Sequence, residues 1–129
     1  MRDTRRFPNS PTSVTQARRF VAGHLEDAPT EVVETVAVMT SELATNSIRH
    51  AATDFEVGVN RTRDEIRVEV TDEGAGVPTV MSPDPSQPSG RGLFIVEKLA
   101  DDWGVNTPSG RAGKTVWFSV SLSSADGSS

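Results

Sequence analysis

Apolar residues recur at helical spacing in three stretches of the chain. The first stretch contains Val14, Ala17, Phe20, Val21 and Leu25, and the second contains Val32, Val33, Val36, Met39, Leu43 and Ile48. The third contains Leu93, Ile95, Val96, Leu99 and Ala100, and it ends near Asp101. Because one face of a helix returns every three to four residues, these stretches predict three amphipathic helices.

Polar residues that can cap a helix stand before the first two stretches. Ser13, with Gln16 three positions later, fits a capping box and is the predicted N-cap of the first helix, while Thr12 is the alternative. Thr30 is the predicted N-cap of the second helix. The second stretch contains no glycine or proline up to position 51 or 52, so this helix should be about 22 residues long.

Strict alternation of apolar and other residues marks the strands. Alternating apolar positions are Phe55, Val57 and Val59, then Ile66, Val68 and Val70, and finally Val116, Phe118, Val120 and Leu122. The polar segment 60–65 between the first two sets predicts a hairpin that is buried on one face. Residues 5–7 and 103–107 are candidates for two further short strands. Segment 79–89 contains three prolines and predicts no regular structure.

This order of elements predicts an α+β fold. Strands joined by short turns imply a mixed, mainly antiparallel sheet with the helices packed on one face, which is a two-layer α/β sandwich. The chain lacks the repeated strand–helix–strand units of a Rossmann fold. Its 129 residues fit one domain, for which we expect an ordered core over residues 5–122 and a flexible tail over 123–129.

Composition excludes several classes of function. A formal net charge of −5 argues against a direct nucleic-acid binder held by bulk electrostatics. The longest apolar runs have four residues, so the sequence predicts no transmembrane helix and no signal peptide. Cysteine is absent, which excludes disulfides, thiolate zinc sites and cysteine nucleophiles. We therefore expect a cytoplasmic protein without a membrane partner.

The first group of residues with chemical potential lies on the long second helix. Glu42, Asn46 and His50 are four residues apart, which places them near one helix face. A carboxylate can deprotonate a nucleophile, and an amide oxygen can ligate Mg²⁺ beside phosphate and water. Arg49 and His50 could contact phosphate oxygens. The alternative interpretation is an ordinary solvated helix face.

Two glycine-rich groups follow. Asp72, Gly74, Gly76 and Val77 come directly after a predicted strand, where an aspartate can accept a hydrogen bond from an exocyclic amine and the glycines allow close approach of a ligand. A plain turn is the alternative.

Gly90, Arg91, Gly92 and Leu93 open the third helix, whose free N–H groups could bind an anion. A glycine hinge is the alternative there. Thr115 on the last strand could bond a ligand or be an ordinary strand residue.

Taken in order, these motifs resemble those of the GHKL ATPase superfamily, which has the Bergerat fold. The similarity runs from RRFPNSPTSVTQARRFV to DDWGVNTPSGRAGKTVWFSV, and it is greatest to the stand-alone anti-sigma-factor serine/threonine kinases of the RsbW type. The resemblance implies binding of ATP and Mg²⁺. It also implies phosphorylation of an anti-anti-sigma protein of the STAS type, sequestration of an alternative sigma factor, and a possible homodimer.

The resemblance also implies a role for each motif. Glu42 would be the general base, Asn46 would ligate Mg²⁺, and Arg49 and His50 would lie near the phosphates. Asp72 would bind the adenine amino group. The remaining expected roles are a base pocket shaped by Gly74, Gly76 and Val77, a backing hydroxyl from Thr115, a lid over 79–90, and closure on the phosphates by Gly90, Arg91, Gly92 and Leu93.

Two other functions remain open from the sequence. One is a catalytically weak or inactive module that binds ATP and switches protein partners. The other is a domain that uses the same fold without nucleotide, in which Glu42 and Asn46 would be ordinary surface residues.

Overall fold

The computed structural model describes residues 2–51, 53–73, 88–107 and 113–122, with the backbone alone for His50 and residues 88–92. Five strands and three helices lie in these ranges. In chain order they are β1 (Arg2–Phe7), α1 (Thr12–Ala22), α2 (Thr30–His50), β2 (Phe55–Arg61), β3 (Glu65–Asp72), α3 (Pro88–Leu99), β4 (Asp102–Asn106) and β5 (Lys114–Ser121). Every helix and strand that the sequence predicts is present.

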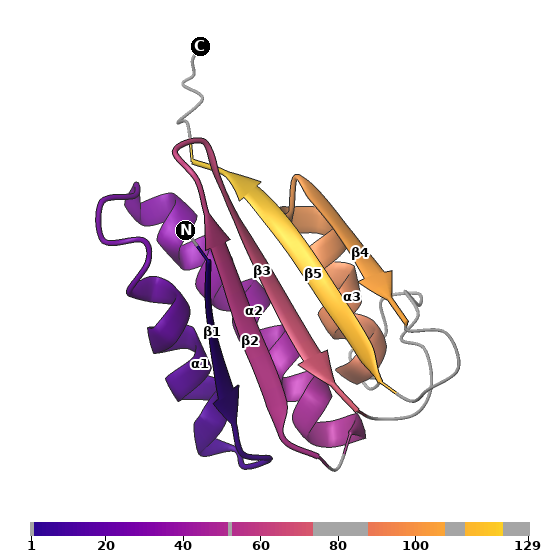
Figure 1. The fold of residues 1–129 in the computed structure, drawn as a ribbon. Coiled ribbons are helices and arrows are strands. Elements are labelled where there is room, and N and C mark those ends of the chain that lie inside the picture. Colours follow the sequence, from indigo (N-terminus) through magenta and orange to yellow (C-terminus); the bar gives the residue numbers. More distant parts are fainter. Residues whose placement is uncertain (1, 52, 74–87, 108–112, 123–129) are drawn as a thin grey trace.

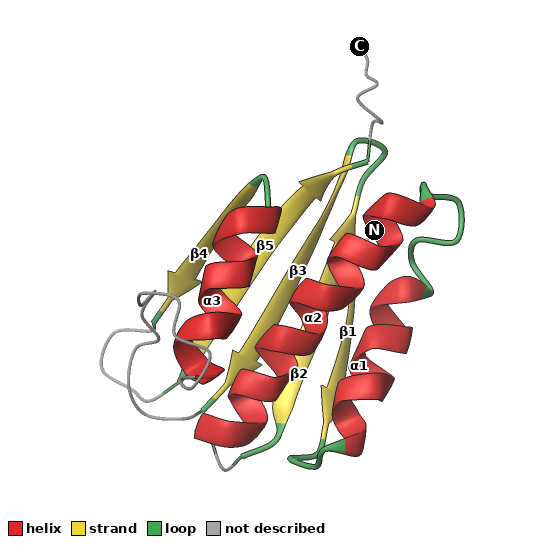
Figure 2. Cartoon of the chain, turned by 180° about the vertical axis from the view of Figure 1, so that it is seen from behind, coloured by secondary structure: helices red, strands yellow, loops and turns green. Residues whose placement is uncertain are grey.

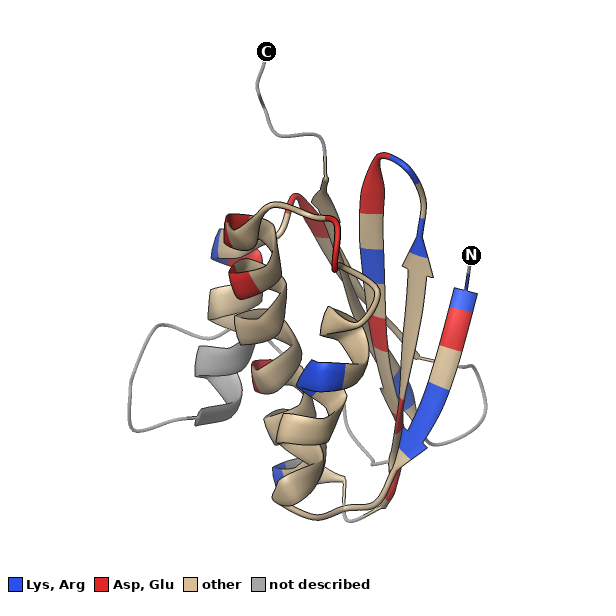
Figure 3. Ribbon diagram, turned by 90° about the vertical axis from the view of Figure 1, so that its left-hand side faces the viewer, with Lys and Arg blue, Asp and Glu red and all other residues tan. Residues whose placement is uncertain are grey.

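The strands form one sheet in the order β1-β2-β3-β5-β4 (Figure 1). All four described pairings are antiparallel, so the expectation of a partly mixed sheet was wrong. The chain leaves β3, forms α3 and β4, and returns as β5 between β3 and β4. The three helices cover one face of the sheet, with α2 between α1 and α3 (Figure 2), and the two layers are seen edge-on in Figure 3. This is the predicted α+β sandwich.

The hydrophobic core lies between the two layers. Alternate residues of β2, β3 and β5 point toward the helices, and α2 contributes the central row. The largest fully buried side chains are Phe55, Phe118, Leu25, Met39, Leu43, Ile66, Leu93, Val21, Val36, Val57, Val59 and Val68. Since these residues come from all three helices, from β2, β3 and β5, and in the case of Leu25 from the loop between α1 and α2, the core fixes the position of α2 over the middle of the sheet.

The helix starts differ from the predicted caps. Ser13 lies inside α1, where its hydroxyl donates to the carbonyl of Pro8 at 2.7 Å instead of capping the helix. α2 begins at Thr30 itself, and Pro29 is the residue that precedes it. Neither helix start has a side-chain capping bond. Proline suits these positions because its fixed φ is compatible with a helix start.

The first strand is longer than predicted. It starts at Arg2 rather than Arg5, and only Phe7 among its six residues is buried. β1 lies at the edge of the sheet, where backbone pairing with β2 from Arg2↔Asn60 to Phe7↔Phe55 holds it in place. Such a strand has no apolar alternation, so periodicity could not find it.

The proposed lid and tail lie outside the described residues, except that 88–90 belong to α3.

The sheet face away from the helices carries a polar network. The guanidinium carbon of Arg67 lies 3.8 Å from the ring centroid of Trp117. Glu69 forms ion pairs with Arg2 at 2.9 Å and with Arg67 at 3.1 Å. A Cβ on Gly104 would lie 2.8 Å from Trp117 Nε1, so a glycine is needed beside the indole ring. These contacts link β1, β3, β5 and β4 across one face.

Candidate functional site

A buried polar cluster joins β3, β5 and α2. Asp72, the last residue of β3, lies directly opposite Lys114, the first residue of β5. Lys114 Nζ donates to Asp72 Oδ1 at 2.8 Å, and Ser47 Oγ of α2 donates to Asp72 Oδ2 at 2.8 Å. Asp72 is 3% exposed and Lys114 is 8% exposed. A carboxylate that is removed from water to this extent is stable only with such partners.

Strand alternation explains why these side chains meet. The even-numbered residues of β3 and β5 face the helices, as the buried pairs Val68–Phe118 and Val70–Val116 show. Asp72 and Lys114 continue the same two rows by one further position. Both side chains therefore enter the space between the layers, at the point where the apolar core ends.

The turn into β5 passes close to Asp72. Gly113 has a φ of +117°, a backbone conformation that residues with a Cβ rarely adopt. A Cβ at this position would lie 3.1 Å from the carbonyl oxygen of Asp72. The glycine therefore allows β5 to start beside the end of β3 and brings Lys114 opposite Asp72.

The helix that supplies Ser47 also carries the predicted catalytic group. Glu42 and Asn46 are both half-buried and lie one helical turn apart on α2, while Arg49 is exposed. The side chain of His50 is not described. With about 100° of rotation per residue, Asn46 and Glu42 point about 100° and 140° away from Ser47 around the helix. They therefore lie on a side of α2 adjoining the one that contacts Asp72 through Ser47.

The third helix brings its N-terminal backbone to the same edge of the molecule. Figure 2 shows the end of β3, the C-terminal end of α2 and the start of α3 at one edge. Gly90, Arg91 and Gly92 lie in the first turns of α3, where backbone N–H groups can bind an anion. The Leu93 side chain is fully buried in the core, and Leu93 is the sixth residue of α3, beyond the four N–H groups that a helix start leaves free. Gly74, Gly76 and Val77 lie outside the described residues.

The structure places Thr115 away from Asp72. Its hydroxyl lies 2.8 Å from that of Thr71, the residue opposite it in the sheet. Odd-numbered residues of β3 and β5 point to the face without helices, so Thr115 and Asp72 lie on opposite faces. The residue of β5 that contacts Asp72 is Lys114, which sequence reasoning missed together with Ser47. The alternation through Val116, Phe118 and Val120 was the signal that could have identified Lys114.

The residues present suit a metal ion that is shared with phosphate. In the ranges that the structure describes, no three His, Asp or Glu side chains gather into a metal site of their own. Mg²⁺ commonly binds proteins through one or two oxygen ligands and completes its shell with substrate phosphates and water. The half-buried Asn46, one turn from Glu42, can supply one such ligand.

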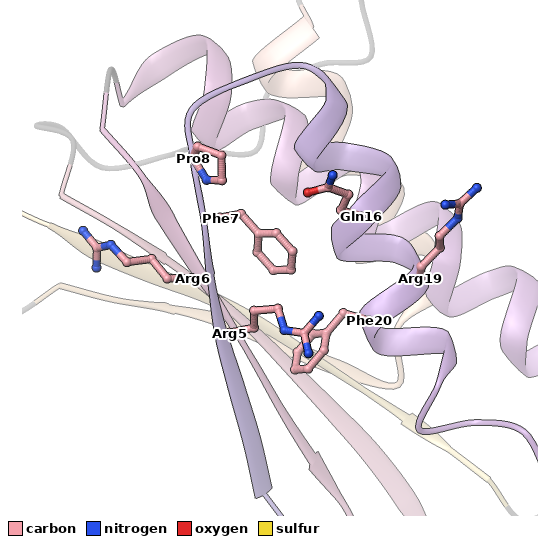
Figure 4. Close-up of a pocket in the computed structure, with 7 residues that line it drawn as sticks. All are labelled: Arg5, Arg6, Phe7, Pro8, Gln16, Arg19 and Phe20. Carbon is pink, nitrogen blue, oxygen red and sulfur yellow. The ribbon is translucent and has the colours of Figure 1, made fainter.

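A separate cavity lies between β1 and α1 (Figure 4). It has a volume of about 370 Å³ and is lined by Arg5, Arg6, Phe7, Pro8, Gln16, Arg19 and Phe20. Arg5 stacks on Phe20 at 5.0 Å from the ring centroid, and Arg6 pairs with Asp54 at 3.6 Å. None of the predicted site residues lines this cavity, which differs in position from the Asp72 cluster.

Comparison with known proteins decides the family. Residues 7–120 match the family model of the histidine kinase-like ATPase domain, HATPase_c_2. The chain belongs to this family. It is therefore a domain of the GHKL superfamily, whose members bind ATP, typically with Mg²⁺. The match contains every described element except the first five residues of β1 and the last residue of β5.

Solved structures agree on the fold of this histidine kinase-like ATPase domain. The Acinetobacter baumannii histidine kinase AdeS matches with a TM-score of 0.50 and 12% sequence identity, over 93% of this chain and 68% of that chain. At this identity the similarity concerns the fold alone. The search of curated proteins found no match. No described helix has the length and apolar character that crossing a membrane would need.

Proposed function

We propose that this domain binds Mg²⁺-ATP at the Asp72 end of the sheet and transfers the γ-phosphate to a serine or threonine of a partner protein. The observation that carries the proposal is the buried Asp72 carboxylate, held by Lys114 and by Ser47 of α2, the helix that also carries Glu42 and Asn46. Asp72 accepts a hydrogen bond from the adenine amino group. Membership of an ATPase family supports this role for the site.

Glu42 is the proposed general base. Its half-buried carboxylate lies one turn from Asn46, the proposed Mg²⁺ ligand, so the proton acceptor and the metal-bound phosphate would be neighbours. Glu42 accepts the proton of the attacking hydroxyl as its oxygen bonds to the γ-phosphorus. The bond from the γ-phosphorus to the β–γ bridging oxygen breaks, and ADP leaves. Bound Mg²⁺ would neutralise charge on the phosphates.

The proposed protein substrate is an anti-anti-sigma protein of the STAS type, and the proposed target of sequestration is an alternative sigma factor. The support is the motif order Glu42–Asn46, Asp72 and Gly90–Gly92, which resembles that of RsbW-type kinases. Arg49 and His50 are proposed phosphate contacts.

Two measurements test this function. Calorimetric titration with ATP, with and without Mg²⁺, should give saturable binding that Mg²⁺ strengthens. Incubation with γ-labelled ATP and purified STAS-type candidates should then label a serine or threonine. Glu42→Gln should abolish labelling and retain ATP binding, while the matched control Glu34→Gln, an exposed position on the same helix, should label at the wild-type rate. Labelling that persists in Glu42→Gln would remove Glu42 as the base.

One outcome would support a different function. If ATP binds and changes the affinity for a partner while no candidate is labelled, the domain is a nucleotide-dependent binding module. The family match supports an ATP-binding regulatory module in either case.

A further inference from the structure

Lys114 is a nearly buried cation with an incomplete set of acceptors. Its side chain is 9% exposed, and its Nζ has one hydrogen-bond acceptor among the described residues, which is Asp72 Oδ1. An ammonium group carries three N–H donors. Two donors of Lys114 therefore have no protein acceptor in the part of the chain that the structure describes.

This arrangement is costly without a further partner. Buried polar groups in native proteins are almost always hydrogen-bonded, and a buried charge needs both a counter-charge and filled donor positions. Asp72 supplies the counter-charge, and Ser47 donates a hydrogen bond to the other oxygen of that carboxylate. Within the described residues, the lysine is thus the member of the cluster with unfilled donor positions, and it lies beside the carboxylate to which the proposed function assigns adenine.

The pair forms a donor and an acceptor side by side. Asp72 offers a carboxylate acceptor and Lys114 an ammonium donor, from directly opposite positions of adjacent strands. Adenine presents a complementary pair on its Watson–Crick edge, with the N6 amine as donor and the ring nitrogen N1 as the neighbouring acceptor. The match is between two protein groups and two adjacent ligand atoms.

We propose that Lys114 contacts the base and donates a hydrogen bond to N1 of adenine while Asp72 accepts from the N6 amine. This inference rests on the proposed binding of ATP and adds a specificity-determining residue to it. Thr115 cannot fill this position because its hydroxyl lies on the other face of the sheet. A role for Lys114 that is limited to holding Asp72 is the main alternative, and the experiment separates the two.

The experiment combines variants of Lys114 with analogues of the base. Dissociation constants are measured by calorimetry for ATP, for 1-deaza-ATP, which lacks the N1 acceptor, and for purine riboside triphosphate, which lacks the amine. For the wild-type protein, loss of N1 should weaken binding roughly tenfold to a hundredfold, because the bond has a charged donor. Lys114→Met should weaken ATP binding by a similar factor and should show no further loss with 1-deaza-ATP.

Controls keep the result interpretable. Lys98→Met removes the other lysine, which is exposed on α3, and should leave all three affinities unchanged. Lys114→Arg keeps the charge and should retain part of the preference for ATP over 1-deaza-ATP. Because the wild-type comparison of ATP with 1-deaza-ATP needs no variant, it can overturn the contact with N1 even if Lys114→Met fails to fold, and Lys114→Arg then tests whether Lys114 is the donor.

Each contrary result has a distinct meaning. Equal wild-type affinity for ATP and 1-deaza-ATP would overturn the contact with N1. A loss in Lys114→Met that persists with 1-deaza-ATP and vanishes with purine riboside triphosphate would show that Lys114 acts through Asp72, which also overturns the direct contact. Absence of any saturable ATP binding by the wild-type protein would instead overturn the proposed function, and this inference with it.

Discussion

The Asp72–Lys114 pair makes a prediction about folding that needs no nucleotide. Each partner is less than one-tenth exposed, and the two charged atoms lie 2.8 Å apart. If Asp72→Asn removes the negative charge, the ammonium of Lys114 stays buried without a counter-charge. Removing one partner of a buried ion pair costs about 3–5 kcal/mol. Lys114→Met removes the counter-charge of the buried carboxylate, which keeps its hydrogen bond from Ser47, and should cost a similar amount.

The double variant gives the sharper result. Asp72→Asn with Lys114→Met removes both charges at once, so no unpaired ion is buried. Its loss of stability should be smaller than the sum of the two single losses by about 2 kcal/mol or more, because each single variant includes the penalty for the charge left behind. Ser47→Ala, which removes one hydrogen bond to the carboxylate, should cost about 1.5–3 kcal/mol.

Urea unfolding followed by tryptophan fluorescence measures these differences. Trp117 on β5 and Trp103 on β4 are both partly buried and report on the sheet near Lys114. A domain of this size has a free energy of unfolding of about 5–15 kcal/mol and an m-value of about 1–3 kcal/mol/M. Asp72→Asn and Lys114→Met should therefore each lower the urea concentration at the unfolding midpoint by roughly 2 M. Losses that add within about 0.5 kcal/mol would refute the reasoning, because they would mean that the two charges do not interact.

Three further positions give independent tests. Thr40 has a fully buried hydroxyl without a hydrogen-bond partner among the described residues, so Thr40→Val should raise the free energy of unfolding by about 1 kcal/mol in the same urea assay. Gly113→Ala, at φ +117° and 3.1 Å from Asp72 O, should lower it by about 1–3 kcal/mol. The Arg61 guanidinium, 2.8 Å from Asp27, lowers the pKa of that carboxyl. Because the pKa of Asp27 is lower in the folded protein, its ion pair stabilises the fold at pH values above the ordinary pKa near 4. This stabilisation is lost as the pH falls through the folded-state pKa, so Asp27→Asn should flatten the decline of Tm below about pH 4.

The fold was predictable wherever burial imposes a period on the sequence. The hairpin of β2 and β3 alternates through Val57, Val59, Val68 and Val70, and these residues are buried as expected. β1 shows the limit of this approach. Its side chains are mostly exposed, and it is held by backbone pairing with β2, which leaves no trace in the pattern of apolar residues. The helices start two residues (α1) and one residue (α2) before the positions that the predicted caps Ser13 and Thr30 imply, because prolines rather than hydroxyl side chains precede them.

The same periodicities bear on the site residues of α2 and β5. Glu42 and Asn46 follow helical spacing on α2, and the structure leaves both half-buried on that helix. On β5, motif resemblance selected Thr115, whereas alternation from Val116, Phe118 and Val120 selects Lys114. A strand reverses the face of its side chains at every residue, so a motif that is misplaced by one position moves to the other side of the sheet. The buried contact with Asp72 shows that, at this position, the parity of the strand is a better guide than the identity of the residue.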